Sequence, residues 1–507
     1  MATPQRIQSG SPGTHPVLQG IVMVFFTLLL IPILGPTRGL LFAGAAIVGV
    51  CGVILLCYKP HLGVAAILAA LIIDIDPIGI RFLSIPYLLT MVLLIPLTLG
   101  ILHDRDIAVL RVPQVVILLA ITGLFTISVV WNYFDYFNSP LRLPPETTRM
   151  LIILVGRFAF LVLFLYFITT RERIELTVWL AIGLVTWLAM DGLYGFVTKS
   201  AIHGHFGGDR AHASFSLAEN ANRLGYICLF GLCLLWFYHS HGKPQRWLIW
   251  LTFPLFFLLP LTVFTTGSRS GLLQTFVLLV FILKEQKGWS IQRRIGTVVG
   301  LGLAGLFVLA VAPSHDVERA ISFNPNADVT TPGEASLRNR LATDFAAIQI
   351  GLSHPLFGVG LANFHLVELL TPDIGSQSKT SNGFTWALTS GGVGVLALYL
   401  LLFFLTYRAL RRLESSGPPE FLWLSKGLKV NLFLFLLFSA FTDFWLSDFL
   451  YLLVAWPIAM TEYWRRQRQH SRQVLAAANA ARIAQLAARR QRHTAPQIFS
   501  PSPGTSA

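Results

Sequence analysis

Residues 150–170 read MLIILVGRFAFLVLFLYFITT, a run of 21 residues in which Arg157 is the only charged side chain. About 20 apolar residues are enough to cross a bilayer as an α-helix. Such a helix has no polar face for water, so lipid or other apolar helices must surround it. The run therefore predicts a membrane-spanning helix, with one arginine inside it.

Similar runs follow one another along most of the chain. The 507 residues are 54% hydrophobic and 12% charged, whereas soluble proteins carry about 25% charged residues. This composition excludes a soluble enzyme and a disordered chain. The four cysteines lie in apolar runs and lack the spacing of metal ligands; they are Cys51, Cys57, Cys228 and Cys233. We predict an all-α polytopic membrane protein with about 12–14 transmembrane helices. The fourteen candidate spans are 17–35, 38–58, 62–76, 84–102, 113–131, 150–170, 175–197, 222–239, 246–266, 268–284, 294–312, 384–407, 427–443 and 447–463.

The charges alternate between the two sides of the predicted membrane. With the N-terminus inside, the inner segments hold 25 Lys/Arg against 8 Asp/Glu, and the outer segments hold 12 against 16. Arg157 within the membrane completes the net charge of +14. Because cytoplasmic loops are enriched in Lys and Arg, we expect both termini in the cytoplasm. The positive net charge thus indicates how the chain is oriented in the membrane and that it contacts membrane lipids. It does not indicate binding to nucleic acid.

The spans and loops suggest four parts. Residues 1–16 form a cytoplasmic leader that precedes a retained first span, and 17–197 form the N-terminal helices. Residues 198–463 contain two long outer segments, 198–221 and the loop 313–383, where function is expected. In the second loop, apolar spacing predicts a short amphipathic helix from Leu337 to Gly351 at the outer surface. Residues 464–507 form a basic cytoplasmic tail, helix-prone to Arg492 and disordered beyond it.

Arginines on the outer side are exceptions to the enrichment of Lys and Arg in cytoplasmic loops, so they are candidates for functional residues. Arg269 lies in GSRSG between two spans, Arg340 opens the predicted amphipathic helix, and Arg210 lies in the first long outer segment. Arg157 and Arg223 lie in or at the edge of a span. Guanidinium groups facing one outer cavity would suit a diphosphate, because they bind phosphate oxygens bidentately. The alternative is interfacial snorkelling, or pairing with Asp191, Asp344, Asp443 or Asp448.

A second motif, HPLFGVGLANFH, occupies residues 354–365. Gly358 and Gly360 allow the backbone to approach other backbone or a ligand closely. His365 is a possible base or ligand, although a structural role in a tight turn is the simpler interpretation.

The order of these motifs resembles the O-antigen ligase and polymerase family over roughly residues 210–405. Asn222-x-Leu-Gly comes first, followed by GSRSG and by Arg340 ahead of HPLFGVGLANF. A Ser381-Asn382 pair and a Gly-Gly-x-Gly span follow. The resemblance implies a location in the bacterial inner membrane, with 313–383 as a periplasmic loop. It also implies glycan transfer at the periplasmic face, from an undecaprenyl-diphosphate-linked donor to a hydroxyl on a lipid A core or on another lipid-linked glycan. It implies that Arg269 and Arg340 hold the diphosphate and stabilise its developing charge, without a metal or other cofactor.

One position departs from the family pattern. The family usually has a His-Asn pair where this chain has Ser381-Asn382, and a serine hydroxyl is too weak to act as a base at neutral pH. Three interpretations follow: His365 takes the proton instead, cleavage of the bond to the diphosphate precedes attack and needs no strong base, or the protein is a divergent member that binds lipid-linked glycan without this chemistry. The predicted catalytic residues are Arg269, Arg340 and His365, and the predicted substrate-binding residues are Arg210, Asn222, Ser381, Asn382 and Arg157. The alternatives are a transporter of an anionic or lipid-linked substrate and a non-catalytic member of a glycan export complex.

Overall fold

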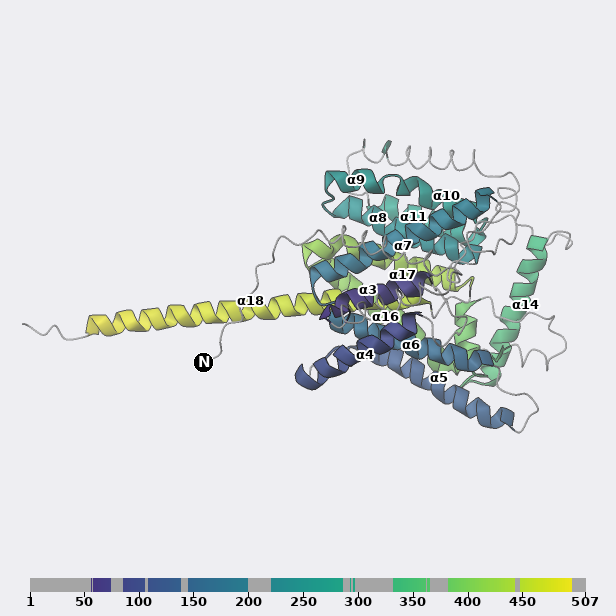
Figure 1. Cartoon of the computed structure of the whole chain (residues 1–507), viewed down its shortest axis with the longest axis horizontal. Coiled ribbons are helices and arrows are strands. Elements are labelled where there is room, and N and C mark those ends of the chain that lie inside the picture. The colour runs from purple at the N-terminus through teal and green to yellow at the C-terminus, as the bar shows by residue number, and fades with distance from the viewer. Residues whose placement is uncertain are drawn as a thin grey trace, which may run out of the picture.

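The computed structural model describes residues 56, 58–73, 85–104, 108–137, 145–198, 220–285, 292, 295–296, 332–361, 363–364, 382–442 and 447–494. Within these ranges all regular structure is helical (Figure 1). The elements are α3 (Pro60–Ile73), α4 (Ile85–Asp104), η2 (Ala108–Arg111), α5 (Pro113–Phe137), α6 (Pro145–Phe167), α7 (Arg171–Thr198), α8 (Ala221–His241), α9 (Arg246–Thr252), α10 (Leu255–Thr265), α11 (Arg269–Glu285), α14 (Pro332–Ser353), α16 (Gly383–Ser416), η4 (Pro419–Phe421), α17 (Leu422–Ser439) and α18 (Asp448–Thr494).

The helices have the length and composition of membrane spans. In the described part of the chain, eight helical segments are long and apolar enough to cross a bilayer, so the chain is an all-α multi-pass membrane protein. A helix coincides with every predicted span from 62–76 to 268–284 and with the last three. The predicted span 246–266 is divided into α9 and α10 at Pro254, which cannot donate a helical hydrogen bond. The predicted spans 17–35, 38–58 and 294–312 lie almost entirely outside the described residues.

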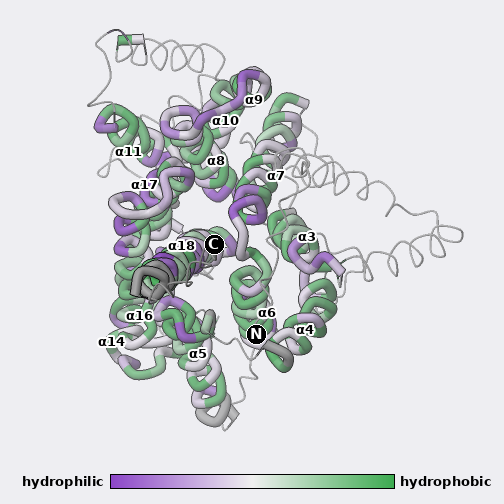
Figure 2. Tube along the Cα trace, turned by 90° about the vertical axis from the view of Figure 1, so that its left-hand side faces the viewer, coloured by the Kyte–Doolittle hydropathy of each residue, from purple (hydrophilic) through white to green (hydrophobic). Residues whose placement is uncertain are grey.

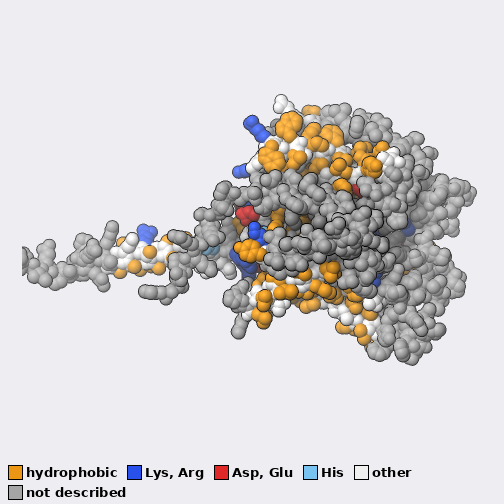
Figure 3. All heavy atoms as spheres, in the orientation of Figure 1, with side chains coloured by type: hydrophobic (Ala, Val, Ile, Leu, Met, Phe, Trp, Pro, Cys, Tyr) orange, Lys and Arg blue, Asp and Glu red, His pale blue; other side chains and the backbone are white. Residues whose placement is uncertain are grey.

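Large apolar side chains gather along the upper and lower parts of the bundle in Figure 3. Met91 and Leu99 on α4, Phe276 on α11 and Phe404 on α16 are each more than half exposed. Exposed apolar area on this scale is unfavourable in water, and lipid chains are its natural surroundings. The exposed faces therefore mark where the bilayer contacts the protein.

The first part of α18 forms the centre of the bundle, as an end-on view shows (Figure 2). Every residue from Ser447 to Met460 is buried, and every residue from Arg465 to Ala487 is exposed. The helix thus continues out of the bundle as a single projecting rod (Figure 1). The helical part of the predicted basic tail is confirmed as far as Thr494, and the residues beyond it lie outside the described part.

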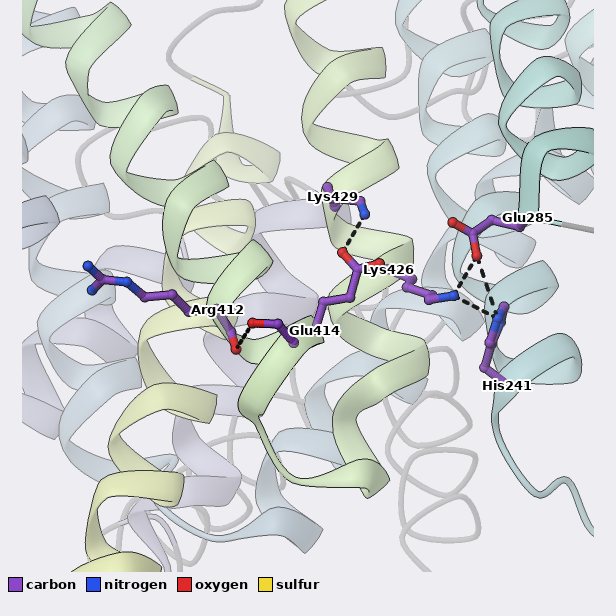
Figure 4. Close-up of polar contacts among 7 residues, drawn as sticks. His241, Glu285, Arg412, Glu414, Lys426 and Lys429 are labelled. Carbon is purple, nitrogen blue, oxygen red and sulfur yellow. Dashed lines mark hydrogen bonds and ion pairs between the residues drawn. The ribbon is translucent and has the colours of Figure 1, made fainter. Parts of the chain in front are cut away.

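The end of the bundle from which α18 projects is called the basic end. There Lys426 of α17 donates to Glu285 of α11 and contacts His241 of α8, while Lys429 pairs with Glu414 of α16 (Figure 4). These pairs join the ends of four helices. Three segments predicted to lie on the same side of the membrane therefore meet in space, which agrees with the alternating topology.

The opposite end, called the loop end, carries the turn 266–268 and the loop 354–361. The helix α14 lies across this end, roughly perpendicular to the bundle (Figure 1). It begins at Pro332, earlier than the predicted Leu337, because proline suits the first position of a helix. Arg340 consequently lies inside the helix and does not open it, which corrects the prediction.

Candidate functional site

The loop 354–361 is held against a break in α16. Helix α16 loses its regular geometry at Gly392, where φ is 76°. The N–H of Val393 donates to the carbonyl of Pro355 at 2.8 Å, and the N–H of Val359 donates to the carbonyl of Thr389 at 2.7 Å. Buried backbone groups need partners, so the loop supplies bonds that the broken helix lacks. The HPLFGVG motif and the Gly-Gly-x-Gly span are therefore two halves of one structural unit.

Glycine is required at the contact between these two segments. A Cβ atom on Gly358 would lie 2.2 Å from the carbonyl oxygen of Thr389, and one on Gly392 would lie 2.5 Å from that of Pro355. Both glycines also have positive φ, at 62° and 76°, a region that other residues rarely adopt. Of the two interpretations that the sequence left open, the structure supports close approach of backbone to backbone for Gly358.

Buried polar side chains from α5 and α6 hold the loop in place. The Ser128 hydroxyl donates to the carbonyl of Phe357 at 2.6 Å, and the Thr147 hydroxyl donates to the carbonyl of Leu361 at 2.9 Å. Directly after the loop, the Asn363 amide donates to the carbonyl of Val359 at 3.0 Å. Sequence reasoning missed Ser128 and Thr147, because single polar residues in an apolar helix carry no sign of a partner more than 200 positions away.

The GSRSG turn brings α11 against α8 at the loop end. Gly267 has a φ of 55° and lets the chain reverse between α10 and α11. The Ser268 hydroxyl accepts from the N–H of Gly271 at 3.1 Å, which is the contact of a helix N-cap. A Cβ atom on Gly225 of α8 would lie 3.4 Å from the Thr266 hydroxyl oxygen, so the two helix starts are in contact. The structure thus joins Asn222-x-Leu-Gly with GSRSG.

Two arginines stand in the first turns of these neighbouring helices. Arg269 is the first residue of α11 and Arg223 lies near the start of α8, and both are half-buried. The N-terminus of a helix carries partial positive charge and unpaired N–H groups, so it favours anions. Asn222 is buried in the same turn of α8, where its N–H donates to the Asn220 side chain at 2.8 Å. The positive charges of Arg223 and Arg269 therefore add to the partial positive charge of the helix N-termini of α8 and α11.

Helix α14 connects Arg340 to the start of α16. One turn after Arg340, the carboxylate of Asp344 accepts from the Thr385 hydroxyl at 3.3 Å. Buried Ala347 and Ile350 pack against Val359 and Phe364. The opposite face exposes an apolar stripe of Leu341, Phe345, Ile348 and Leu352. The sequence correctly placed the first three of these on one amphipathic face.

Asn382 has a structural partner at the start of α16. Its side-chain oxygen accepts from the N–H groups of Phe384 at 2.8 Å and Thr385 at 3.4 Å, which makes it the N-cap of the helix. Beyond the break, the helix bends back, since the rings of Phe384 and Tyr399 are 6.0 Å apart. Fifteen residues of straight helix would separate them by about 22 Å. The predicted role of Asn382 toward the substrate stays a prediction.

Arg157 is bound by a carboxylate within the bundle. Its guanidinium donates to both oxygens of Asp448, with Nε to Oδ1 at 2.7 Å and Nη2 to Oδ2 at 3.0 Å. The Arg157 side chain is 21% exposed and that of Asp448 4%. Pairing with an aspartate is one of the interpretations that the sequence left open, and the structure supports it. A substrate contact by Arg157 stays a prediction.

We expect Asp448→Asn to destabilise the protein, because it leaves the Arg157 charge without its bidentate partner. We expect Arg157→Gln to do the same. The double variant should lose less than the sum of the single losses, by a coupling of about 1–3 kcal/mol. Thermal unfolding of the four proteins in one detergent measures this coupling. Additive losses would contradict a structural role for the pair.

Three predicted residues, Arg210, His365 and Ser381, lie outside the described residues, and their roles stay predictions. Among the described residues, no group of three or more His, Cys, Asp or Glu side chains is arranged to hold a metal ion.

The fold and the site define a polytopic membrane protein that carries arginines and hydrogen-bonded turns at its loop end. Residues 253–400 match a protein family described as O-antigen ligase. This range contains GSRSG, α14, the loop 354–361 and the break in α16, and the match assigns it to the O-antigen ligase family. A search of curated proteins finds no match for this chain. The family supports glycan transfer of the ligase or polymerase type as the general activity.

Proposed function

We propose that the protein transfers a glycan from an undecaprenyl-diphosphate-type carrier to a hydroxyl acceptor at the periplasmic face of the bacterial inner membrane. The main support is the GSRSG turn. It places Arg269, the first residue of α11, at the end of the bundle where Arg223 lies in the first turn of α8. A diphosphate carries several negative charges, and this arrangement offers guanidinium donors and two helix N-termini. Residues 198–463 form the proposed catalytic region.

In the proposed reaction, the acceptor oxygen attacks the anomeric carbon of the donor sugar. The bond from that carbon to the diphosphate oxygen breaks, and the carrier diphosphate leaves with the electron pair. Arg269 and Arg340 stabilise the negative charge that develops on it, which is the usual task of fixed donors at a reaction centre. Attack opposite the leaving group inverts the anomeric configuration.

The hydroxyl proton needs an acceptor in this scheme. We assign it to His365, because Ser381 occupies the position of the family's histidine and cannot act as a base at neutral pH. Arg210, Asn222 and Ser381 are assigned to binding of the donor or acceptor. Asn382, whose side-chain oxygen caps α16, would contribute through its remaining amide donors.

Purified protein in liposomes tests this function against its two alternatives. With a lipid-linked glycan on the accessible face and a second lipid-linked or lipid A-linked acceptor, we expect the glycan to appear on the acceptor. Movement of labelled substrate across the bilayer without transfer would favour a transporter. Absence of both, with the protein folded and bound to lipid-linked glycan, would favour a non-catalytic member of an export complex. Offering the two acceptors separately distinguishes a ligase from a polymerase.

A further inference from the structure

A cavity of about 450 Å³ opens at the basic end, away from the candidate site. It lies between the start of α5, the last turns of α16 and the part of α18 that leaves the bundle. Its walls are mainly apolar and include Pro113, Leu405, Ala409 and Ile458. Cavities of 300–1,000 Å³ with apolar walls and a few polar groups are the usual form of a ligand site. The volume and lining therefore suit an apolar ligand with a polar head.

The rim of this cavity carries two arginines. Arg408 and Arg412 line it from positions one helical turn apart on α16, and both are exposed. In Figure 4 the Arg412 side chain points away from the Glu414–Lys429 pair. Within the described part of the chain, neither guanidinium forms a hydrogen bond or an ion pair.

The acidic groups near these arginines are already occupied. Glu462 lines the cavity, but its carboxylate accepts from Arg465 at 2.7 Å. Glu414 is paired with Lys429. The rim therefore presents uncompensated positive charge above an apolar interior, which matches an anion attached to a hydrocarbon chain.

The cavity lies at the level where the bundle ends. Trp464 lines it, and the Arg468 guanidinium lies 4.1 Å from the centre of the Trp464 ring. Tryptophan concentrates at the boundary between bilayer and water. From Arg465 onward α18 is exposed. The interior of the cavity thus faces hydrocarbon depth and its rim faces headgroup depth.

We propose that this cavity binds an anionic phospholipid of the leaflet at the basic end. One acyl chain occupies the apolar interior, and Arg408 and Arg412 hold the phosphate with charge-assisted hydrogen bonds. Basic pockets between transmembrane helices on the cytoplasmic side are a recognised form of anionic lipid site. The bound lipid joins α5, α16 and α18, so it stabilises the arrangement of these three helices.

The test uses the full chain, stripped of lipid in a non-ionic detergent. Phosphatidylglycerol and phosphatidylcholine with the same acyl chains are titrated in mixed micelles, while native mass spectrometry counts bound lipid and a thermal scan records Tm. We expect phosphatidylglycerol to bind preferentially and to raise Tm. Arg408→Gln/Arg412→Gln should weaken this binding at least about tenfold, because the charge-assisted bonds are lost.

Two further variants separate a site from general attraction. Arg472→Gln/Arg482→Gln removes the same charge from the exposed part of α18 and should leave binding unchanged. Ala409→Trp should fill the cavity and weaken binding although both rim arginines remain. The proposal is overturned by equal binding of the two lipids, by equal loss in both arginine pairs, or by undiminished binding in Ala409→Trp.

Discussion

Replacing Arg269 with alanine is expected to abolish high-molecular-weight surface glycan, while the protein still reaches the membrane in normal amount. Arg269 starts α11, next to the start of α8. Loss of one donor to a developing negative charge typically lowers a rate about 10²–10³-fold. We expect the same loss for Arg340→Ala. Gel analysis of the glycan and immunoblotting of membranes measure the two quantities.

The lysine variant and a matched control make this test specific. Arg269→Lys keeps the charge but cannot form the bidentate contact, so activity should stay low. Arg246 is also the first residue of a helix, α9, but it follows α8 at the basic end. Arg246→Ala should leave the glycan normal. Unchanged surface glycan in both Arg269→Ala and Arg340→Ala would contradict the proposed glycan transfer by these two arginines.

Gly392→Ala is expected to be the most damaging conservative change in α16. The residue has a φ of 76°, which disfavours any side chain by about 1–2 kcal/mol. The added Cβ would also lie 2.5 Å from the carbonyl oxygen of Pro355, and backbone on both sides prevents relaxation. We expect a loss of about 3 kcal/mol or more in stability, together with loss of glycan. Tm in detergent and the amount of folded protein in membranes report the first effect.

Gly394→Ala is the control for this variant. It lies two residues further along the same helix, is exposed, and would bring its Cβ no closer than 3.8 Å to another side chain. Alanine is favoured over glycine in a helix by about 1 kcal/mol, so Gly394→Ala should be neutral or stabilising. If both variants behaved alike, the contact between the loop and the broken helix would not explain the glycine.

Much of the fold was predictable because membrane spans are local. Each span needs its own apolar run, so α4 to α8 and α16 to α18 could be placed from hydropathy alone. The motif GSRSG was predicted to join two spans directly, and α10 and α11 confirm this. The predicted start of α14 was wrong because the apolar spacing begins only at Leu337, whereas the helix begins at Pro332, a residue that suits the first helical position.

The candidate site was only partly predictable because its partners are remote in sequence. The sequence proposed pairing with aspartate for Arg157 but could not choose Asp448 from four candidates. It assigned Asn382 a role toward substrate and did not indicate that its side-chain oxygen caps α16. It contained no sign that Ser128 would hold the loop 354–361.

The sequence by itself determined the class of protein, the approximate positions of the spans and the alternation of charge across the membrane. Each of these properties depends only on one short segment and on whether lipid or water surrounds it. Only the tertiary structure decided why Gly358 and Gly392 are glycines, which acid binds Arg157 and where an apolar cavity opens beside Arg408 and Arg412. These features arise where backbone and side chains from distant helices pack within a few ångströms, and no local pattern encodes such contacts.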